Sequence, residues 1–267
     1  MNVYELLNLL EQHFPARFAM QDDIFGLEIQ TGDTEISNML VCYEITEQVI
    51  QEAVQLKCQL ILTYHPFIYF PIKTINSNDR ISSLLTEILK NDISIISIHT
   101  RFDTYQYGSN YLFATALGLE IDKFLEPNSE NNEFGMGIIG NFKEQLSVDI
   151  FLEKIQKITK SILRYSEGNS NLIKSVGIVA GSGKEYIFQA LKNHLDAFIT
   201  GDISYHYFHN ANNKLWLIDA GHWETEQFIV PALTEFLKNN INRKKLNIYK
   251  SQINTNPIKY YWDRKTI

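Results

Sequence analysis

Apolar and polar residues follow two different periods along the first half of the chain. Residues 3–13 carry apolar side chains at helical spacing, which predicts an amphipathic helix that ends before Pro15. Thr46 is a suitable N-cap for a second helix over 47–57. The other elements predicted in this half are strands at 39–43, 59–63 and 93–98 and a helix at 80–90. Short strands separated by helices are typical of βαβ units, so we expect an α/β fold with a parallel or mixed sheet.

The second half returns to the same alternation after a polar interruption. The segment 123–134, KFLEPNSENNEF, has little periodicity and many turn-forming residues, so it predicts a connection or hairpin loop. Beyond it we expect strands at 136–140, 174–180, 196–199 and 215–219, a helix at 147–159 and an edge strand at 246–250. This organisation predicts two α/β halves, 1–125 and 126–267.

Composition and charge narrow the classes of partner. The 267 residues carry a net charge of −7, which gives no basic stripe for phosphate backbones, so we do not expect a nucleic-acid partner. The N-terminus lacks the basic and then apolar regions of a secretory signal, and no apolar stretch is long enough to cross a bilayer. Cys42 and Cys58 stand in apolar runs that are typical of buried, reduced thiols. We therefore expect a cytoplasmic protein.

Polar residues collect where the predicted strands end. The segments that follow five of these strands are TYHP, HTRFD, GSG, TGDISYH and DAGHWETE. In open α/β sheets ligands bind outside the carboxyl ends of the strands, because the loops converge there. Function is therefore expected at this edge.

Two of these segments have a spacing that suits a metal. His222 and Glu226 stand four apart at the start of a helical run, and His99 and Asp103 have the same separation. Imidazole and carboxylate together suit zinc, iron, manganese or nickel, and a carboxylate can bridge two cations. The alternative for each histidine alone is a hydrogen-bonded loop residue, so the hypothesis depends on their clustering.

Three other features have ordinary explanations. GIVAGSGKE at 177–185 lacks the spacing and the Ser or Thr of a nucleoside-triphosphatase loop, so a tight strand-to-helix turn is favoured over an anion site. The aromatic side chains in 67–70 and 205–208 are either core residues or the wall of a pocket. The basic run in 240–245 is interpreted as a solvated loop.

The motifs together resemble the Nif three-like family of dinuclear-metal proteins, many of which are called GTP cyclohydrolase 1 type 2 homologues. The matching segments are DDIFGLEIQTG, TYHPFIYFPIKTI, HTRFDTYQYGSNYLFATALGL, GSGKEYIFQALKNHLDAFITGDISYH and IDAGHWETE. The resemblance implies two interlinked α/β domains with mixed sheets, a homohexameric ring, and two divalent cations between the halves. Carried over by motif, the ligands are His65, Asp103, His222 and Glu226. Many relatives have a histidine where this chain has Tyr64, which binds metal well only as phenolate.

The resemblance also implies a function and a rival. The leading hypothesis is a metal-dependent hydrolase acting on a small molecule or nucleotide, with ring opening of GTP by attack of an activated water as the named reaction. His99, Asp202 and His206 are the candidate proton carriers. The rival is a non-catalytic metal carrier or hexameric scaffold in which the cations fix the domain interface.

Overall fold

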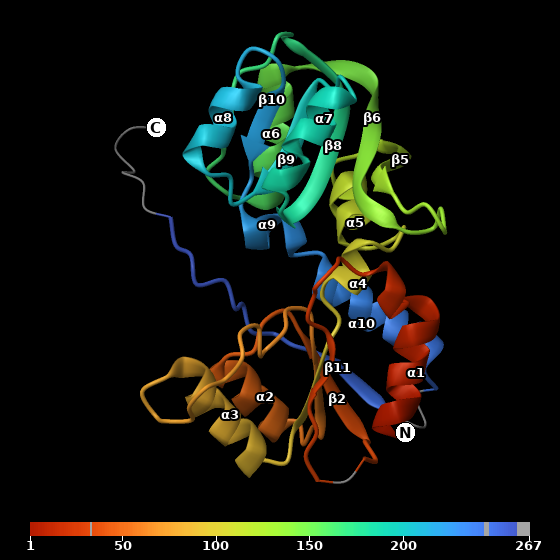
Figure 1. Cartoon of the computed structure of the whole chain (residues 1–267), viewed down its shortest axis with the longest axis vertical. Helices are drawn as coiled ribbons and strands as arrows, with labels where there is room; N and C mark the ends of the chain where they lie inside the picture. Colours follow the sequence, from red (N-terminus) through yellow and green to blue (C-terminus); the bar gives the residue numbers. More distant parts are fainter. Residues whose placement is uncertain (33, 243–245, 261–267) are drawn as a thin grey trace. The chain divides into compact units, whose positions relative to one another are not determined.

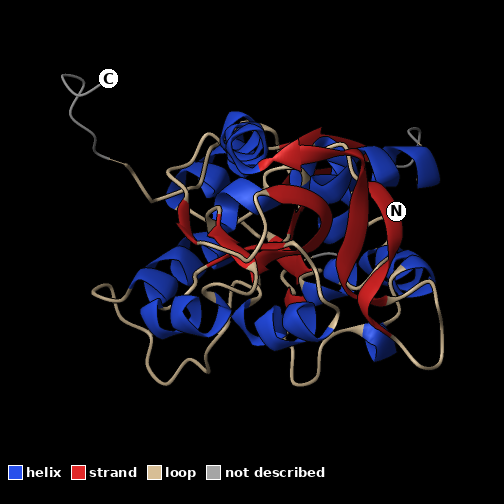
Figure 2. Cartoon of the chain, turned by 90° about the horizontal axis from the view of Figure 1, so that it is seen from above, coloured by secondary structure: helices blue, strands red, loops and turns tan. Residues whose placement is uncertain are grey.

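The computed structural model describes residues 1–32, 34–242 and 246–260, and contacts divide the chain into two compact units. The first unit combines Met1–Phe102 with Ile229–Thr255, and the second combines Asp103–Phe228 with the described residues from Asn256 onward. Both units contain helices and strands (Figure 2), so the expected α/β class is confirmed.

The first unit is built around a five-stranded mixed sheet. Its order is β1-β4-β3-β2-β11, in which β1 runs antiparallel to β4 and all other neighbours are parallel. The strands are β1 (Gly26–Ile29), β2 (Asn38–Cys42), β3 (Leu60–Thr63), β4 (Ser94–Ser97) and β11 (Asn247–Lys250). The helices are α1 (Val3–His13), α2 (Glu47–Gln55), α3 (Arg80–Lys90) and α10 (Ile229–Asn240), with a 3-10 turn η1 (Ala16–Phe18).

Helices cover both faces of this sheet. Apolar residues of α2 and α3 form one core cluster with alternate residues of the central strands, and α10 contacts β2 and β11. Figure 1 shows α2 and α3 on one side of β2 and α1 and α10 on the other. Burial on both faces explains why the central strands β2, β3 and β4 are rich in apolar residues and do not alternate.

The second unit contains a six-stranded sheet of order β5-β6-β8-β9-β10-β7. Strands β8, β9 and β10 are parallel, and antiparallel strands flank them on both sides. The strands are β5 (Glu120–Pro127), β6 (Gly135–Ser147), β7 (Arg164–Ser166), β8 (Leu172–Ser182), β9 (Ala197–Gly201) and β10 (Trp216–Asp219). The helices are α5 (Ser109–Ala116), α6 (Val148–Thr159), α7 (Ile187–Lys192), α8 (Tyr205–Ala211) and α9 (His222–Glu226), with a 3-10 turn η2 (Lys184–Tyr186).

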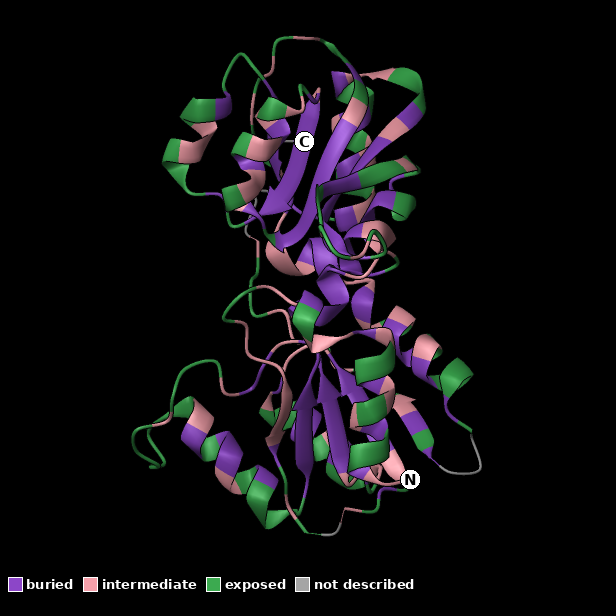
Figure 3. Cartoon of the chain, turned by 45° about the vertical axis from the view of Figure 1, so that its right-hand side comes forward, coloured by how far each residue is buried: buried purple, intermediate pink, exposed green. Residues whose placement is uncertain are grey.

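The core of the second unit lies between its sheet and two helices. Phe113 of α5 and Phe151 and Ile155 of α6 are fully buried against the central strands, and α7 and α8 contact β9 and β10. In Figure 3 the central strands of the sheet are coloured as buried, whereas the helices have exposed faces. This buried framework holds the carboxyl ends of β8, β9 and β10 in fixed register.

Most predicted elements are confirmed within two residues at each end. The 123–134 segment differs, because β5 runs to Pro127 and 128–134 is the loop of an antiparallel β5–β6 hairpin inside the second unit. Contacts therefore divide the chain after Phe102, Phe228 and Thr255, whereas the sequence suggested halves 1–125 and 126–267. Part of the basic run in 240–245 lies outside the described residues.

The described helices include none long and apolar enough to span a membrane.

Candidate metal centre

In the first unit, candidate ligands follow the carboxyl ends of the parallel strands β3 and β4. Tyr64 and His65 come directly after β3, and Nδ1 of His65 lies 3.2 Å from Oε2 of Glu44, which follows β2. An Nδ1–H that donates to a carboxylate fixes the tautomer in which Nε2 carries the lone pair. The polypeptide therefore holds His65 in the form that binds a cation through Nε2.

His99 has the same kind of support. Its Nδ1 lies 2.5 Å from Oδ1 of Asp23, and Oδ2 of Asp23 accepts from the hydroxyl of Thr100. Burial alone would raise the pKa of Asp23, but the hydrogen bond and charge of His99 outweigh it, so this pKa is lowered. The carboxylate thus stays ionised and orients the imidazole.

Tyr64 lies beneath these histidines in an aromatic cluster. Its side chain is 1% exposed, and its ring centroid lies 4.9 Å from that of His65 and 5.9 Å from that of His99. The ring of Tyr43 stacks on it at 5.7 Å. A phenol binds metal well only after it loses its proton, so Tyr64 is a weaker candidate ligand than a histidine at this position.

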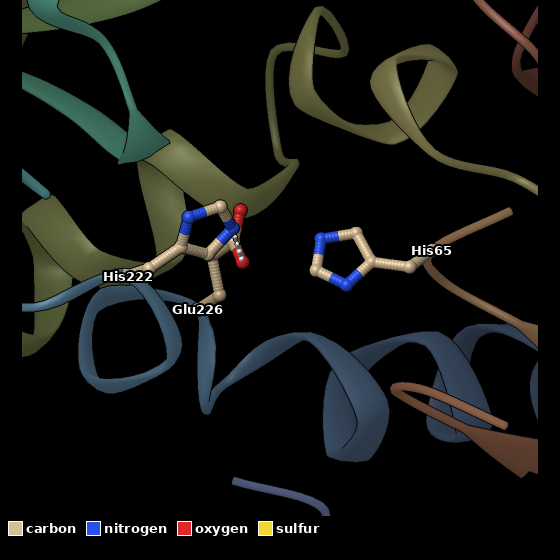
Figure 4. Close-up of side chains that lie close together, drawn as sticks. All are labelled: His65, His222 and Glu226. Carbon is tan, nitrogen blue, oxygen red and sulfur yellow. Dashed lines mark ion pairs between the residues drawn. The ribbon is translucent and has the colours of Figure 1, made fainter. Parts of the chain in front are cut away.

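In the second unit, the spacing of His222 and Glu226 has the predicted consequence. Both side chains project from one face of α9, and Nε2 of His222 lies 3.1 Å from Oε2 of Glu226. Figure 4 shows this pair with its ion pair dashed, and it also labels His65 of the first unit. The carboxylate of Glu226 is only 4% exposed, so the pair sits where water screens it little.

A second carboxylate holds the other nitrogen of His222. Oδ2 of Asp202, directly after β9, lies 2.6 Å from Nδ1 of His222, and this hydrogen bond lowers the pKa of Asp202. Burial alone would lower the pKa of His222, but Glu226 and Asp202 outweigh it and raise the pKa from 6.5 to about 11. Without a cation, the imidazole is therefore protonated at neutral pH.

The backbone of β8 closely approaches the ligand atoms of this pair. Gly181, at the end of β8, has a φ of +68°, and a Cβ there would stand 2.3 Å from Oε1 of Glu226 and 3.3 Å from Nε2 of His222. No side chain other than hydrogen fits at this position. An imidazole nitrogen and a carboxylate oxygen held side by side suit the ligand preferences of a divalent cation, so the residues fit the implied metal.

Asp103 and His206 have different environments. Asp103 is buried at the end of α4 (Thr100–Asp103), where its carboxylate accepts from the hydroxyl of Ser109. His99 lies just before this helix and has a φ of +39°, which is not helical. His99 and Asp103 therefore do not share one helical face, although their spacing of four is the same as that of His222 and Glu226. His206 is exposed on α8, with its ring 5.4 Å from that of Tyr205.

The glycine-rich segment after β8 is a tight turn, as the spacing predicts. The N–H of Gly181 donates to Thr225 and the N–H of Gly183 donates to Thr200, both at 2.8 Å. These two donors are engaged within the protein, which agrees with the turn and not with an anion site.

Sequence reasoning missed the carboxylates that support the histidines. Glu44 follows a predicted strand and could have been found by the same strand-end rule as His65. Asp23 lies in DDIFG, a segment used only for the resemblance, and no local spacing links it to His99, 76 residues later.

A family model describes these motifs and their order. The model of Duf34/NIF3 (NGG1p interacting factor 3) matches residues 1–257. The chain belongs to the NIF3 family. The resemblance stated from the sequence is therefore confirmed.

Named relatives share nearly the full length of this NIF3-family chain. A Clostridium acetobutylicum protein named GTP cyclohydrolase 1 type 2 homolog is 27% identical, covering 97% of this chain and 99% of the relative. A Helicobacter pylori protein named GTP cyclohydrolase 1 type 2 is 32% identical, covering 88% and 91%. The crystal structure of a Staphylococcus aureus hypothetical protein matches with a TM-score of 0.89 and 26% identity, covering 98% and 99%.

Proposed function

We propose that this NIF3-family chain is a divalent-metal-dependent hydrolase. The observation that carries the proposal is the pair His222 and Glu226, whose Nε2 and Oε2 atoms lie 3.1 Å apart on one face of α9. We infer that His65 of the first unit is a further ligand, because its imidazole suits the same divalent cations. We propose these three as the ligands of one cation.

Asp103 and Tyr64 extend this proposal to a second cation. Asp103 supplies a buried carboxylate, and carboxylates can bridge two metal ions. Tyr64 stands where many relatives carry a histidine, and its phenol would need to lose a proton to bind well. We therefore propose that the second cation binds more weakly than the first.

Three further side chains have proposed roles in orienting the ligands and transferring protons. A bound divalent cation would lower the pKa of a water and polarise the bond under attack. Asp202 holds Nδ1 of His222 and so keeps Nε2 directed at Glu226, which gives it an orienting role beside its proposed role as proton carrier. His99, held by Asp23, is the proposed proton carrier of the first unit, and exposed His206 is a third candidate that can exchange protons with solvent.

The names of the relatives suggest a nucleotide substrate, with GTP ring opening as the first reaction to test. The test is an activity screen of metal-loaded protein against GTP, other nucleotides, phosphodiesters and small cyclic amides, followed by mass spectrometry. Turnover that disappears with a chelator and returns with added cation supports the proposal. Absence of turnover with every substrate, on protein that holds metal, would favour a metal carrier or scaffold.

A single substitution tests the ligand assignment without a substrate. Glu226→Gln keeps the shape of the side chain but removes the charge, so we expect the purified protein to lose most of its metal. The matched control is Glu235→Gln, which changes an exposed glutamate on α10. Equal metal in Glu226→Gln and wild type by elemental analysis would overturn the assignment.

We also propose that the chain assembles as a homohexamer, as the resemblance implies. If the cations serve chemistry, chelation should leave the assembly intact, because interfaces between subunits spread over large areas. Size-exclusion chromatography with light scattering, run with and without chelator, measures this. Dissociation on chelation would favour the scaffold.

A further inference from the structure

The helix that carries His222 and Glu226 is too short to hold its own orientation. Helix α9 has five residues, and its N-cap, Gly221, provides no side-chain hydrogen bond. Isolated helices need many more residues to be stable in water, because nucleation fixes several dihedral angles for each first hydrogen bond. The direction of the two ligand side chains must therefore come from contacts with the rest of the unit.

One such contact ties α9 to the sheet. The hydroxyl of Thr225 accepts from the N–H of Gly181 at 2.8 Å and lies within hydrogen-bonding distance, 2.8 Å, of the carbonyl of His222. Thr225 is fully buried. This contact anchors one side of α9 to the end of β8.

A second contact ties α9 to the C-terminal segment 256–260. Glu224 is 3% exposed, and its Oε1 accepts from Nδ2 of Asn256 at 3.0 Å and from the hydroxyl of Tyr260 at 3.3 Å. Glu224 stands two residues from both His222 and Glu226, about 200° around the helix, so it points away from the ligand face. The segment therefore holds the back of α9.

These donors matter because a buried carboxylate is costly without partners. Among the described residues, the other oxygen of Glu224, Oε2, has no hydrogen-bond partner. Asn256 and Tyr260 thus donate side-chain hydrogen bonds to the Oε1 atom of this carboxylate. Tyr260 lies beyond residues 1–257, so the family model does not describe this contact.

We propose that Asn256 and Tyr260 are positioning residues for the cation ligands, acting through Glu224. The inference rests on the proposed metal-binding function of His222 and Glu226. When the two donors are removed, the side of α9 that carries Glu224 loses its hydrogen bonds to the segment, while the contacts of α9 with β8, β9 and α5 remain. The helix can then shift on that side, so the ligand pair spends less time in the binding geometry. The cation should then bind more weakly and with altered coordination, although none of the changed residues is a ligand.

The test compares metal binding by wild type, Asn256→Ala, Tyr260→Phe and the double variant. Cobalt(II) is the probe, because its visible spectrum reports coordination geometry, and its Kd is measured by competition with a chelator. We expect the Kd of the double variant to rise about tenfold. This is the lower end of the range of affinity losses found when groups that orient metal ligands are removed. The cobalt spectrum should shift as well. Ile258→Ala is the matched control, since it alters an exposed side chain of the same segment.

Further variants separate positioning from general stability. Tyr260→Phe keeps the ring and removes only the hydroxyl, and Glu224→Gln keeps an acceptor oxygen for both donors and should bind cobalt almost as wild type does. If the segment only stabilises the fold, the double variant will melt at a lower temperature but keep the wild-type Kd and spectrum, which would overturn this inference alone. Wild-type protein that binds no divalent cation would overturn the proposed function, and this inference with it.

Discussion

Each unit presents histidine at the carboxyl edge of its parallel strands, but the two units hold it differently. In the first unit, His65 and His99 each use Nδ1 to contact one carboxylate, and aromatic rings surround them. In the second unit, His222 stands between two carboxylates, with Asp202 at Nδ1 and Glu226 at Nε2. The first arrangement orients each imidazole through one nitrogen, whereas the second places a carboxylate at both nitrogens and so raises the pKa of His222.

The two units would therefore contribute different kinds of ligand to the proposed metal site. The second unit supplies negative charge, because Glu226 and Asp103 are buried carboxylates. The first unit supplies oriented imidazole with little added charge. In the proposed ligand set, His65 would add nitrogen to the nitrogen and oxygen of His222 and Glu226, and such a mixed set suits zinc, iron or manganese.

The largest expected effect comes from removing the carboxylates that orient the histidines. Asp202→Asn should weaken cation binding about ten- to a hundredfold, because it loosens His222 and reduces nearby charge. Glu44→Gln should weaken binding less, since Glu44 lies 3.2 Å from Nδ1 of His65 and Asp202 lies 2.6 Å from Nδ1 of His222. Isothermal titration with zinc measures both. A larger loss in Glu44→Gln would reverse the comparison.

The proton on His222 gives a pH dependence with a definite sign. The raised pKa of His222, about 11, means that the protonated imidazole stabilises the cation-free protein at neutral pH, and this contribution is lost as pH rises through that value. A cation at Nε2 must displace the proton, so binding releases it. Apparent affinity should therefore rise about tenfold per pH unit below this pKa if one proton is released.

Calorimetry in buffers of different ionisation enthalpy measures that proton. The expected result at pH 8 is close to one proton released per cation, and Asp202→Asn should reduce the number by lowering the pKa of His222. Binding with no proton release would mean that His222 is neutral before the cation arrives.

The sequence predicted the elements well and the partnerships poorly, for a physical reason. Thr46 accepts from the N–H of Val49 as an N-cap should, because a cap is a local interaction. His222 and Glu226 share a helix and were likewise found. Asp202 lies next to His222 only because β9 and β10 are parallel neighbours in the sheet. The order of strands in a sheet cannot be predicted from a local sequence pattern.

The same reason explains the elements that were missed. Strand β1 is four residues long and β7 is three, and neither has a continuous apolar run. In β5, only Phe124 and Leu125 are buried, so most of the strand has the composition of a loop. An edge strand needs only one buried face, and its sequence therefore carries a weak signal.

A smaller effect is expected from substituting Tyr64. The substitution tests whether this residue limits the binding of the proposed second cation. Tyr64→His replaces a buried phenol by an imidazole, the better ligand at neutral pH, so bound metal per chain should increase. Elemental analysis after dialysis against zinc measures the increase, and Tyr43→His on the stacked neighbouring ring is the control. Unchanged stoichiometry would show that Tyr64 ligates adequately or does not ligate.

The smallest effect should fall on stability and leave metal binding unchanged. Thr46 caps α2 two residues after Glu44, and its hydroxyl accepts from the N–H of Val49 at 3.3 Å. Thr46→Ala removes this acceptor and should lower the free energy of unfolding by about 1 kcal/mol, measured by urea denaturation of metal-free protein. Thr46→Ser, which keeps a hydroxyl, should recover most of the loss. Because Glu44 and His65 are held by the ends of β2 and β3 and not by α2, zinc affinity should match wild type. A clear loss of zinc affinity in Thr46→Ala would mean that the first unit's carboxyl edge depends on its helices, as that of the second unit does through α9.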